Sequence, residues 1–152
     1  MNTKLSFFEK FFGSGFYTGY ISFIPGTFGS LAALIIYYIP GFENPLILIP
    51  CIIIFTFYGI YTGNKFENVY GKDPSQCTID EVVGMWISLL FLPKIIAISI
   101  ITFFIWRILD IIKPFPARNF EKIKGGLGIV LDDIISAIYT LIIVHVFLII
   151  FK

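Results

Sequence analysis

Charge is scarce in this chain. Charged residues make up 14% of its 152 residues, while hydrophobic residues make up 57%. Soluble domains are typically about 45 to 50% apolar. The shortage of charge therefore argues against a soluble domain and indicates an integral membrane protein, which we expect to form a single domain over residues 1–152. The 11 basic and 10 acidic residues leave no basic excess, which argues against nucleic acid as a partner.

Cysteine and histidine are also scarce, with two cysteines and one histidine. Cys51 lies in an apolar run and Cys77 lies beside an acidic pair, so they form neither a disulfide framework nor a metal-ligand spacing. His145 stands alone in the last apolar run, where a packed or hydrogen-bonded histidine is the simplest interpretation. The sequence contains no Ser-His-Asp, Cys-His or zinc-type arrangement.

Long apolar segments make up much of the chain. They cover residues 28–39, 45–61, 79–112 and 129–151, with a polar stretch over 62–78. A helix needs roughly 20 apolar residues to span a bilayer, so we expect an all-α membrane bundle with about three to four apolar helices or half-helices. The third segment is interrupted by Pro93 and Lys94, which predicts two helical pieces that bend back.

The basic residues predict the orientation of the bundle. The turn over residues 41–44 has none, whereas three other polar stretches carry them. By the positive-inside rule these three stretches face the cytoplasm, which makes the protein multi-pass with a polar site on its cytoplasmic face. The stretches are marked by Lys4 and Lys10, by Lys65 and Lys72, and by Arg107, Lys113, Arg118, Lys122 and Lys124.

Five carboxylates lie directly against the apolar segments. An ionised side chain in the bilayer costs about 2.5 kcal/mol or more, so acids in this position are functional candidates that need a partner. Mg²⁺ prefers carboxylate and phosphate oxygens, and it uses few protein ligands together with substrate phosphate. We therefore predict a Mg²⁺ site formed by Asp80, Glu81, Asp110, Asp132 and Asp133.

The first acidic pair has a simpler alternative interpretation. In CTIDEVVGMW, Thr78 is a good N-cap, and Glu81 three residues later would complete a capping box. Asp80 would then complement the positive end of the helix dipole. A helix cap alone would therefore explain Glu81.

Basic residues and glycines near the other acids suggest phosphate contacts. Arg107 and Lys113 lie three residues on either side of Asp110, which suits a phosphate beside a metal, although a surface salt-bridge ladder has the same spacing. Gly125 and Gly126 precede the helix that carries the last acidic pair, so their N-H groups could approach a phosphate, or they could form a flexible turn. We add Thr27, in the turn PGT, to this set; its alternative is a helix entry.

Four blocks of the sequence together resemble the phosphatidylglycerophosphatase A family. They are PGTFGSL, KDPSQCTIDEVVGMWISL, RILDIIKPFPARNFE and GGLGIVLDDIISAIY, in the family's order and over most of the chain outside the apolar spacers. Two positions depart from the family's pattern. Ser22 stands where many members have proline, and Phe115 replaces the usual tryptophan. Neither change removes an ionisable group, so they bear on loop shape more than on activity.

The resemblance implies a Mg²⁺-dependent hydrolase in a bacterial-type inner membrane, which converts phosphatidylglycerophosphate to phosphatidylglycerol and inorganic phosphate. It assigns the acidic pairs and Asp110, with Arg107 and Lys113, to the site. A CDP-alcohol phosphotransferase is one alternative, although its acids form one continuous motif and these come from three segments. A non-enzymatic ion or proton pathway is the other alternative. The sequence does not predict an oligomeric state.

Overall fold

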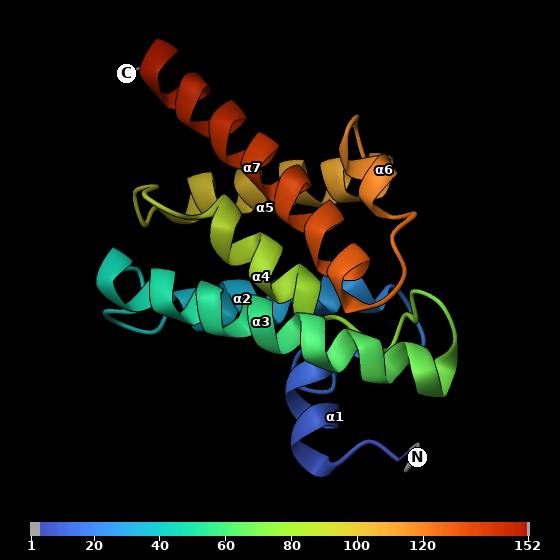
Figure 1. Cartoon of the computed structure of the whole chain (residues 1–152). Coiled ribbons are helices and arrows are strands. Elements are labelled where there is room, and N and C mark those ends of the chain that lie inside the picture. Colours follow the sequence, from blue (N-terminus) through green and yellow to red (C-terminus); the bar gives the residue numbers. More distant parts are fainter. Residues whose placement is uncertain (1–3, 152) are drawn as a thin grey trace.

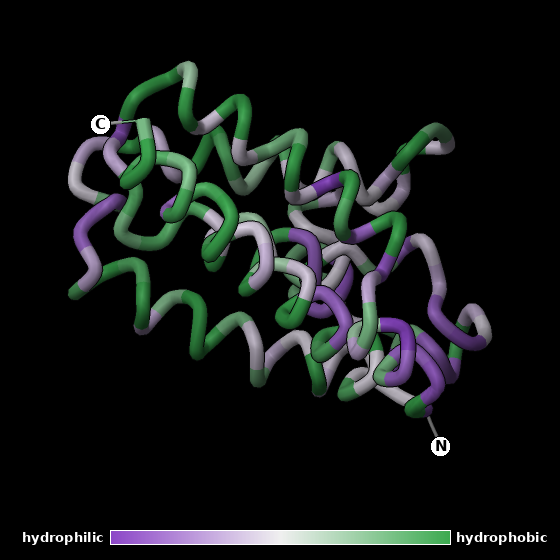
Figure 2. Tube along the Cα trace, turned by 90° about the horizontal axis from the view of Figure 1, so that it is seen from above, coloured by the Kyte–Doolittle hydropathy of each residue, from purple (hydrophilic) through white to green (hydrophobic). Residues whose placement is uncertain are grey.

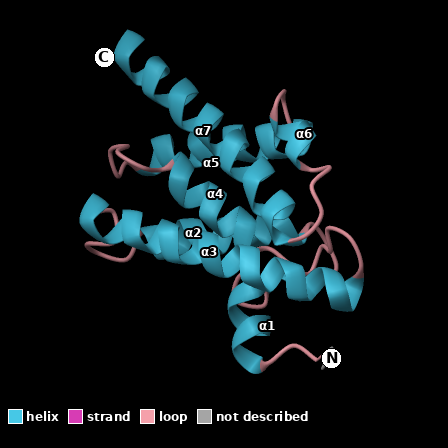
Figure 3. Ribbon diagram, viewed as in Figure 1, coloured by secondary structure: helices cyan, strands magenta, loops and turns pink. Residues whose placement is uncertain are grey.

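The computed structural model describes residues 4–151, and this part of the chain consists only of helices and loops (Figure 3). The all-α prediction is confirmed. Five apolar helices, α2 to α5 and α7, are joined by two short helices and one 3₁₀ turn (Figure 1). The elements are α1 Phe7–Gly13, η1 Thr18–Tyr20, α2 Pro25–Tyr37, α3 Pro45–Tyr70, α4 Ile79–Ser88, α5 Ile96–Ile112, α6 Ala117–Phe120 and α7 Gly126–Ile150.

The predicted break in the third apolar segment is present. Helix α4 ends at Ser88, and α5 begins at Ile96 after the turn that contains Pro93. The second piece returns to the end where the first began, because Asp80 at the start of α4 and Asp110 near the end of α5 both lie close to Asp133 of α7. The two half-helices therefore deliver acids to one place.

Helix α3 is longer than the sequence suggested. We expected a polar stretch from residue 62, but the helix continues to Tyr70. Its polar half is held by packing: Thr62, Gly63 and Phe66 are buried, and a Cβ at Gly63 would lie about 2.6 Å from the backbone of Gly126 in α7. Tertiary contact with α7 thus extends the helix beyond the apolar run that predicted it.

Helix α4 forms the centre of the bundle. It packs against α2, α3, α5 and α7, and nearly all of its residues are buried. Two tryptophans fix its neighbours. Trp86 donates to the carbonyl of Ala33 in α2 at 3.0 Å, and Trp106 of α5 donates to Ser30 of α2 at 3.0 Å. Gly84 leaves the space into which the Trp106 ring packs.

Two helices are long and apolar enough to cross a bilayer. They are α3, with a mean hydropathy of 2.0, and α7, with 2.4. Only 22% and 28% of the residues in these windows are buried, whereas the core helix of a soluble protein would be mostly buried. Polar residues gather toward one end of the bundle, and apolar residues cover most of the rest (Figure 2). This distribution indicates membrane association.

Helix α1 runs across α3 and is fixed to it by one acid (Figure 1). Glu9 closes a capping box by accepting the N-H of Ser6 at 2.7 Å. Its carboxylate also accepts the hydroxyl of Tyr61 at 3.1 Å and forms an ion pair with Lys65. Chiefly because of the hydrogen bond from Lys65, the pKa of Glu9 falls from 4.5 to about 2.

Replacing Glu9 with glutamine should lower the melting temperature by a few degrees at neutral pH. A folded-state pKa below the unfolded value stabilises the protein at pH above about 4.5, and this contribution is lost as the pH falls toward 2. The difference between wild type and Glu9→Gln should therefore shrink over that range. Thermal unfolding in detergent at several pH values measures it, with Lys10→Gln on the same helix as the control. A difference that is constant with pH would contradict the assignment.

Candidate functional site

The structure brings all five predicted carboxylates to one end of the bundle. Asp80 and Glu81 are in the first turn of α4, Asp110 is in the last turn of α5, and Asp132 and Asp133 are in the second turn of α7. The four aspartates are buried, with 3 to 7% of each residue exposed, and Glu81 is half-buried. Such burial of carboxylates requires compensating positive charge.

Three of the acids form the centre of the site. Asp80, Glu81 and Asp133 each offer a carboxylate oxygen, and these oxygens lie within 4.8 Å of one another. Each residue also has a buried oxygen for which the chain from residue 4 to 151 supplies no hydrogen-bond partner: Oδ1 of Asp80, Oε2 of Glu81 and Oδ2 of Asp133. Unsatisfied buried oxygens on converging side chains point to a ligand that donates positive charge.

Burial governs the charge of the acids on α4. It raises the pKa of Glu81 to about 7, with the neighbouring Asp110 adding to the effect and Arg107 opposing it. Burial, together with the charge of Glu81, also raises the pKa of Asp80 well above its usual range. The protein alone therefore disfavours the ionised forms of these acids, and a cation among them would reverse that preference.

The donor set fits a hard divalent cation. Carboxylate oxygens are the ligands that Mg²⁺ favours, and Mg²⁺ commonly keeps waters and substrate phosphate for its remaining positions. The described residues that converge here contribute neither cysteine nor histidine, which softer metals prefer. Asp80, Glu81 and Asp133 are the residues that could hold the ion.

The remaining two acids flank this centre as ion pairs. Asp110 Oδ2 lies 2.6 Å from Nη1 of Arg107, and Asp132 Oδ2 lies 2.5 Å from Nζ of Lys113. Arg107 and Lys113, which share one face by sequence, thus pair with acids of different helices. Within residues 4–151 the buried Nε of Arg107 has no acceptor, so it is free to donate to an incoming anion.

The capping-box interpretation of Glu81 is wrong. Thr78 occupies the N-cap position of α4 but makes no side-chain capping bond there. Its hydroxyl instead lies 3.1 Å from the hydroxyl of Thr18. Since Glu81 does not serve the helix start, its carboxylate remains available to the acidic centre. A contact between distant segments removed the cap, which local sequence could not reveal.

The glycines before α7 make different contacts from those expected. The N-H of Gly125 donates to Oε2 of Glu67 at 2.9 Å, and the N-H of Gly126 donates to Oδ1 of Asn64 at 2.9 Å. Both amides, which we had assigned to substrate phosphate, are therefore already satisfied by α3. Their role in this structure is to hold the start of α7 against α3, and they stay out of the phosphate contacts proposed below.

The turn that contains Thr27 does reach the site. Its neighbour Gly26 lies against the acidic centre: a Cβ there would overlap Oε1 of Glu81 and would lie 3.0 Å from Nη2 of Arg107. Thr27 itself is half-buried in the first turn of α2. The absence of a side chain at Gly26 thus leaves the space that the Glu81 carboxylate occupies.

Sequence reasoning missed three residues that position the site. Ser30 is fully buried and accepts hydrogen bonds from Trp106 and from Arg107, the latter at 3.4 Å. Asn64 and Glu67 of α3 cap α7. Ser30 belongs to the block PGTFGSL, whereas the two capping residues lie outside all four blocks, in the stretch that we expected to be a polar loop.

Comparison with known proteins agrees with this arrangement. The family model described as Phosphatidylglycerophosphatase A matches residues 11–148. The chain belongs to the phosphatidylglycerophosphatase A family. It is 35% identical over 130 residues to Phosphatidylglycerophosphatase A of Escherichia coli, covering 82% of this chain and 74% of that protein. With the Haemophilus influenzae protein of the same name it shares 38% over 137 residues, covering 86% and 82%.

A third relative carries a different name. A Bacteroides thetaiotaomicron protein, provisionally named a phosphatidylinositol-3-phosphatase, is 38% identical over 149 residues, covering 93% of this chain and 94% of its own. No solved structure matches the chain significantly. The family match includes all five acids with Arg107 and Lys113, so the resemblance of the four blocks to this family is confirmed.

Proposed function

We propose that this chain is a Mg²⁺-dependent phosphatidylglycerophosphatase, which hydrolyses phosphatidylglycerophosphate to phosphatidylglycerol and inorganic phosphate. One observation carries the proposal. In a member of this family, three carboxylates converge with buried, unpartnered oxygens, and beside them lies an arginine with a free N-H donor. Within residues 4–151 none of these three acids forms an ion pair, which suits a metal ion and the phosphate bound to it.

Each residue has a distinct part in this proposal. Asp80, Glu81 and Asp133 would hold the ion, which when bound would offset phosphate charge and make a water molecule more acidic. Arg107, oriented by Asp110 and Ser30, would donate its free Nε to a phosphate oxygen. Lys113 neutralises Asp132, and its positive charge lies beside the acidic centre. Thr27 stays a candidate for the phosphate contacts.

The reaction would take place at the cytoplasmic face of a bacterial-type inner membrane. Lys113, which pairs with Asp132, and the neighbouring cations Lys72, Arg118 and Lys122 lie at the end of the bundle that holds the acids. At the other end Lys94 pairs with Glu43 at 2.7 Å. The excess of basic residues on the site's side supports a cytoplasmic location. The apolar helices would retain the lipid tails, so that only the head group reaches the acids.

Phosphate release from a panel of lipid phosphates tests the function. Purified protein should release phosphate from phosphatidylglycerophosphate when Mg²⁺ is present, should lose this activity in excess EDTA, and should regain it when Mg²⁺ is restored. Phosphatidylinositol-3-phosphate belongs in the panel because of the named relative. If no lipid phosphate is hydrolysed in the presence of Mg²⁺, the enzyme proposal fails. Activity that is insensitive to EDTA would refute the metal assignment alone.

A further inference from the structure

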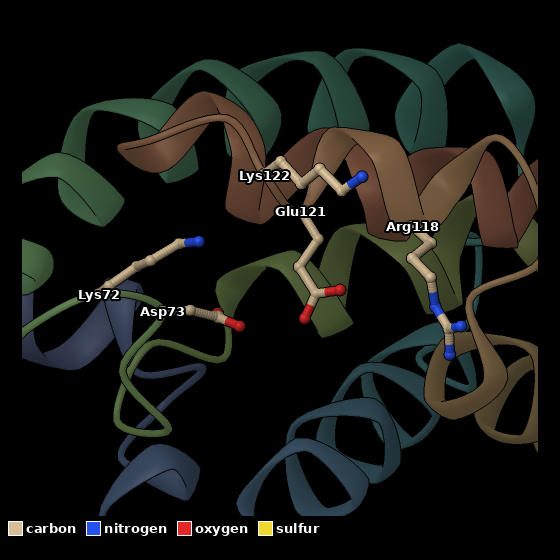
Figure 4. Close-up of a pocket in the computed structure, with 5 residues that line it drawn as sticks. All are labelled: Lys72, Asp73, Arg118, Glu121 and Lys122. Carbon is tan, nitrogen blue, oxygen red and sulfur yellow. The ribbon is translucent and has the colours of Figure 1, made fainter.

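A polar cavity opens beside the acidic centre. Its volume is about 310 Å³, at the lower end of the range of roughly 300 to 1,000 Å³ that is typical of ligand pockets. Two segments that are distant in sequence face each other across it (Figure 4). The loop after α3 supplies Lys72 and Asp73, and the segment from α6 onward supplies Arg118, Glu121 and Lys122.

The cavity is connected to the acids through one residue. Lys113 Nζ lies 3.7 Å from Oε1 of Glu121 in the cavity wall and 2.5 Å from Oδ2 of Asp132. Lys72, Asp73 and Glu121 also line an adjoining space that borders Asp132 and is too narrow to admit water. An anion in the cavity would therefore lie next to the reaction site without occupying its centre.

Among the residues that the structure describes, the cations of the cavity form no ion pair. The ion pairs found among residues 4–151 do not include Lys72, Arg118 or Lys122. The carboxylate of Glu121 lies between the side chains of Asp73 and Arg118, and its ion-pair partner is Lys113 (Figure 4). The three cations outnumber the two carboxylates of the lining, Asp73 and Glu121. Two lysines and an arginine around a space of this size are suited to a phosphate group, because arginine and lysine both donate charged hydrogen bonds to it.

We propose that this cavity is a second phosphate-binding site, separate from the one at the acidic centre. The proposal rests on the proposed function, which supplies two sources of such an anion. One is inorganic phosphate, which is released at the acidic centre and would rebind here. The other is the phosphate of a lipid head group, which would bind here before it reaches the acids. Both are recognised by the same three cations.

The test replaces the three cations of the cavity together, and a control variant loses the same net charge elsewhere in the chain. The variant Lys72→Gln, Arg118→Gln, Lys122→Gln is compared with Lys4→Gln, Lys10→Gln, Lys124→Gln, whose residues are exposed and do not line the cavity. Steady-state kinetics at fixed ionic strength give KM for phosphatidylglycerophosphate in vesicles and the inhibition constant of inorganic phosphate. At least one of these should rise about tenfold in the first variant only, since exposed charged contacts are individually weak but here act together.

The two readouts distinguish the sources. A higher inhibition constant with an unchanged KM assigns the site to released phosphate, a higher KM alone assigns it to the lipid head group, and a rise in both assigns it to both. If both variants match the wild type in KM and in inhibition, the proposal is overturned. Equal melting temperatures confirm that the variants are folded.

A direct binding measurement separates this proposal from the enzyme assignment. Titration of wild type with inorganic phosphate, followed by phosphorus NMR, needs no turnover. If the wild type hydrolyses no lipid phosphate, the proposed function fails, and the titration still decides the cavity. Binding that is lost in the cavity variant and kept in the matched control supports the site. When the wild type is inactive, binding that is equal in both variants, or absent from the wild type, overturns it; when the wild type is active, the same result overturns it unless KM rises in the cavity variant alone.

Discussion

Asp133→Asn should lower kcat for phosphate release by at least about 100-fold, the scale of losing one strong electrostatic contact in an active site. The substitution keeps the shape of the side chain and removes the charge from a residue that shares the acidic centre with Asp80 and Glu81. Fewer anionic oxygens would bind Mg²⁺ more weakly. The concentration of Mg²⁺ that gives half-maximal activity should therefore rise as well, and a Mg²⁺ titration of initial rates measures both effects.

The matched control is Glu43→Gln, which also removes one carboxylate charge but at the opposite end of the bundle, where Glu43 pairs with Lys94. Its kcat and Mg²⁺ dependence should stay near those of the wild type. Thermal unfolding without Mg²⁺ shows whether Asp133→Asn still folds. A folded Asp133→Asn protein with wild-type kcat would remove Asp133 from the metal site, even if the enzyme assignment is correct.

Gly126→Ala should destabilise the crossing of α3 and α7 beside the site. A Cβ at this position would overlap the backbone carbonyl of Ile60, and neither backbone can move without opening the crossing of α3 and α7. Overpacking of a close contact typically costs about 1 to 3 kcal/mol. For a chain of this size, each kcal/mol corresponds to roughly 2 to 4 °C in melting temperature. The variant should therefore melt several degrees lower, and its activity should fall with the folded fraction.

This substitution also separates two interpretations of the glycines. In a loop that binds phosphate through its backbone N-H, a Cβ would crowd the anion and raise KM with little effect on stability. In a close helix crossing, a Cβ would lower the melting temperature instead. Leu127→Ala serves as the control, because the neighbouring Leu127 is 43% exposed and its truncation leaves the crossing intact. If Gly126→Ala melts like the wild type but has a higher KM, the glycine acts on phosphate and the packing argument fails.

The gathering of the acids was predictable because each one stands where an apolar run meets a polar loop. Asp80 opens a helix and Asp110 closes one, so a bend at Pro93 between them brings both to the same end. Membrane residence restricts such charged helix ends to the surfaces of the bilayer. Hydropathy alone therefore predicts which residues meet, without any knowledge of their side-chain contacts.

The sequence did not predict which groups satisfy the helix starts. A capping box is a local pattern, and TIDE matches it, yet Thr78 pairs with Thr18, which lies 60 residues earlier. The start of α7 has no side-chain cap of its own and takes Asn64 and Glu67 from another helix. These partners are fixed only when α3 packs against α7, so local preference was overridden by tertiary contact.

The length of α2 sets the distance between the polar ends of the protein on this side. Helix α2 has 13 residues, or about 20 Å at 1.5 Å per residue, and it runs from Gly26 beside Glu81 to Tyr37 beside Lys94. The hydrocarbon core of a bilayer is about 30 Å thick. The polar ends of the protein are thus closer together here than the two faces of the membrane. A bilayer that thins locally to match this short side would bring lipid head groups closer to the acids, which is one way in which hydrophobic mismatch is accommodated.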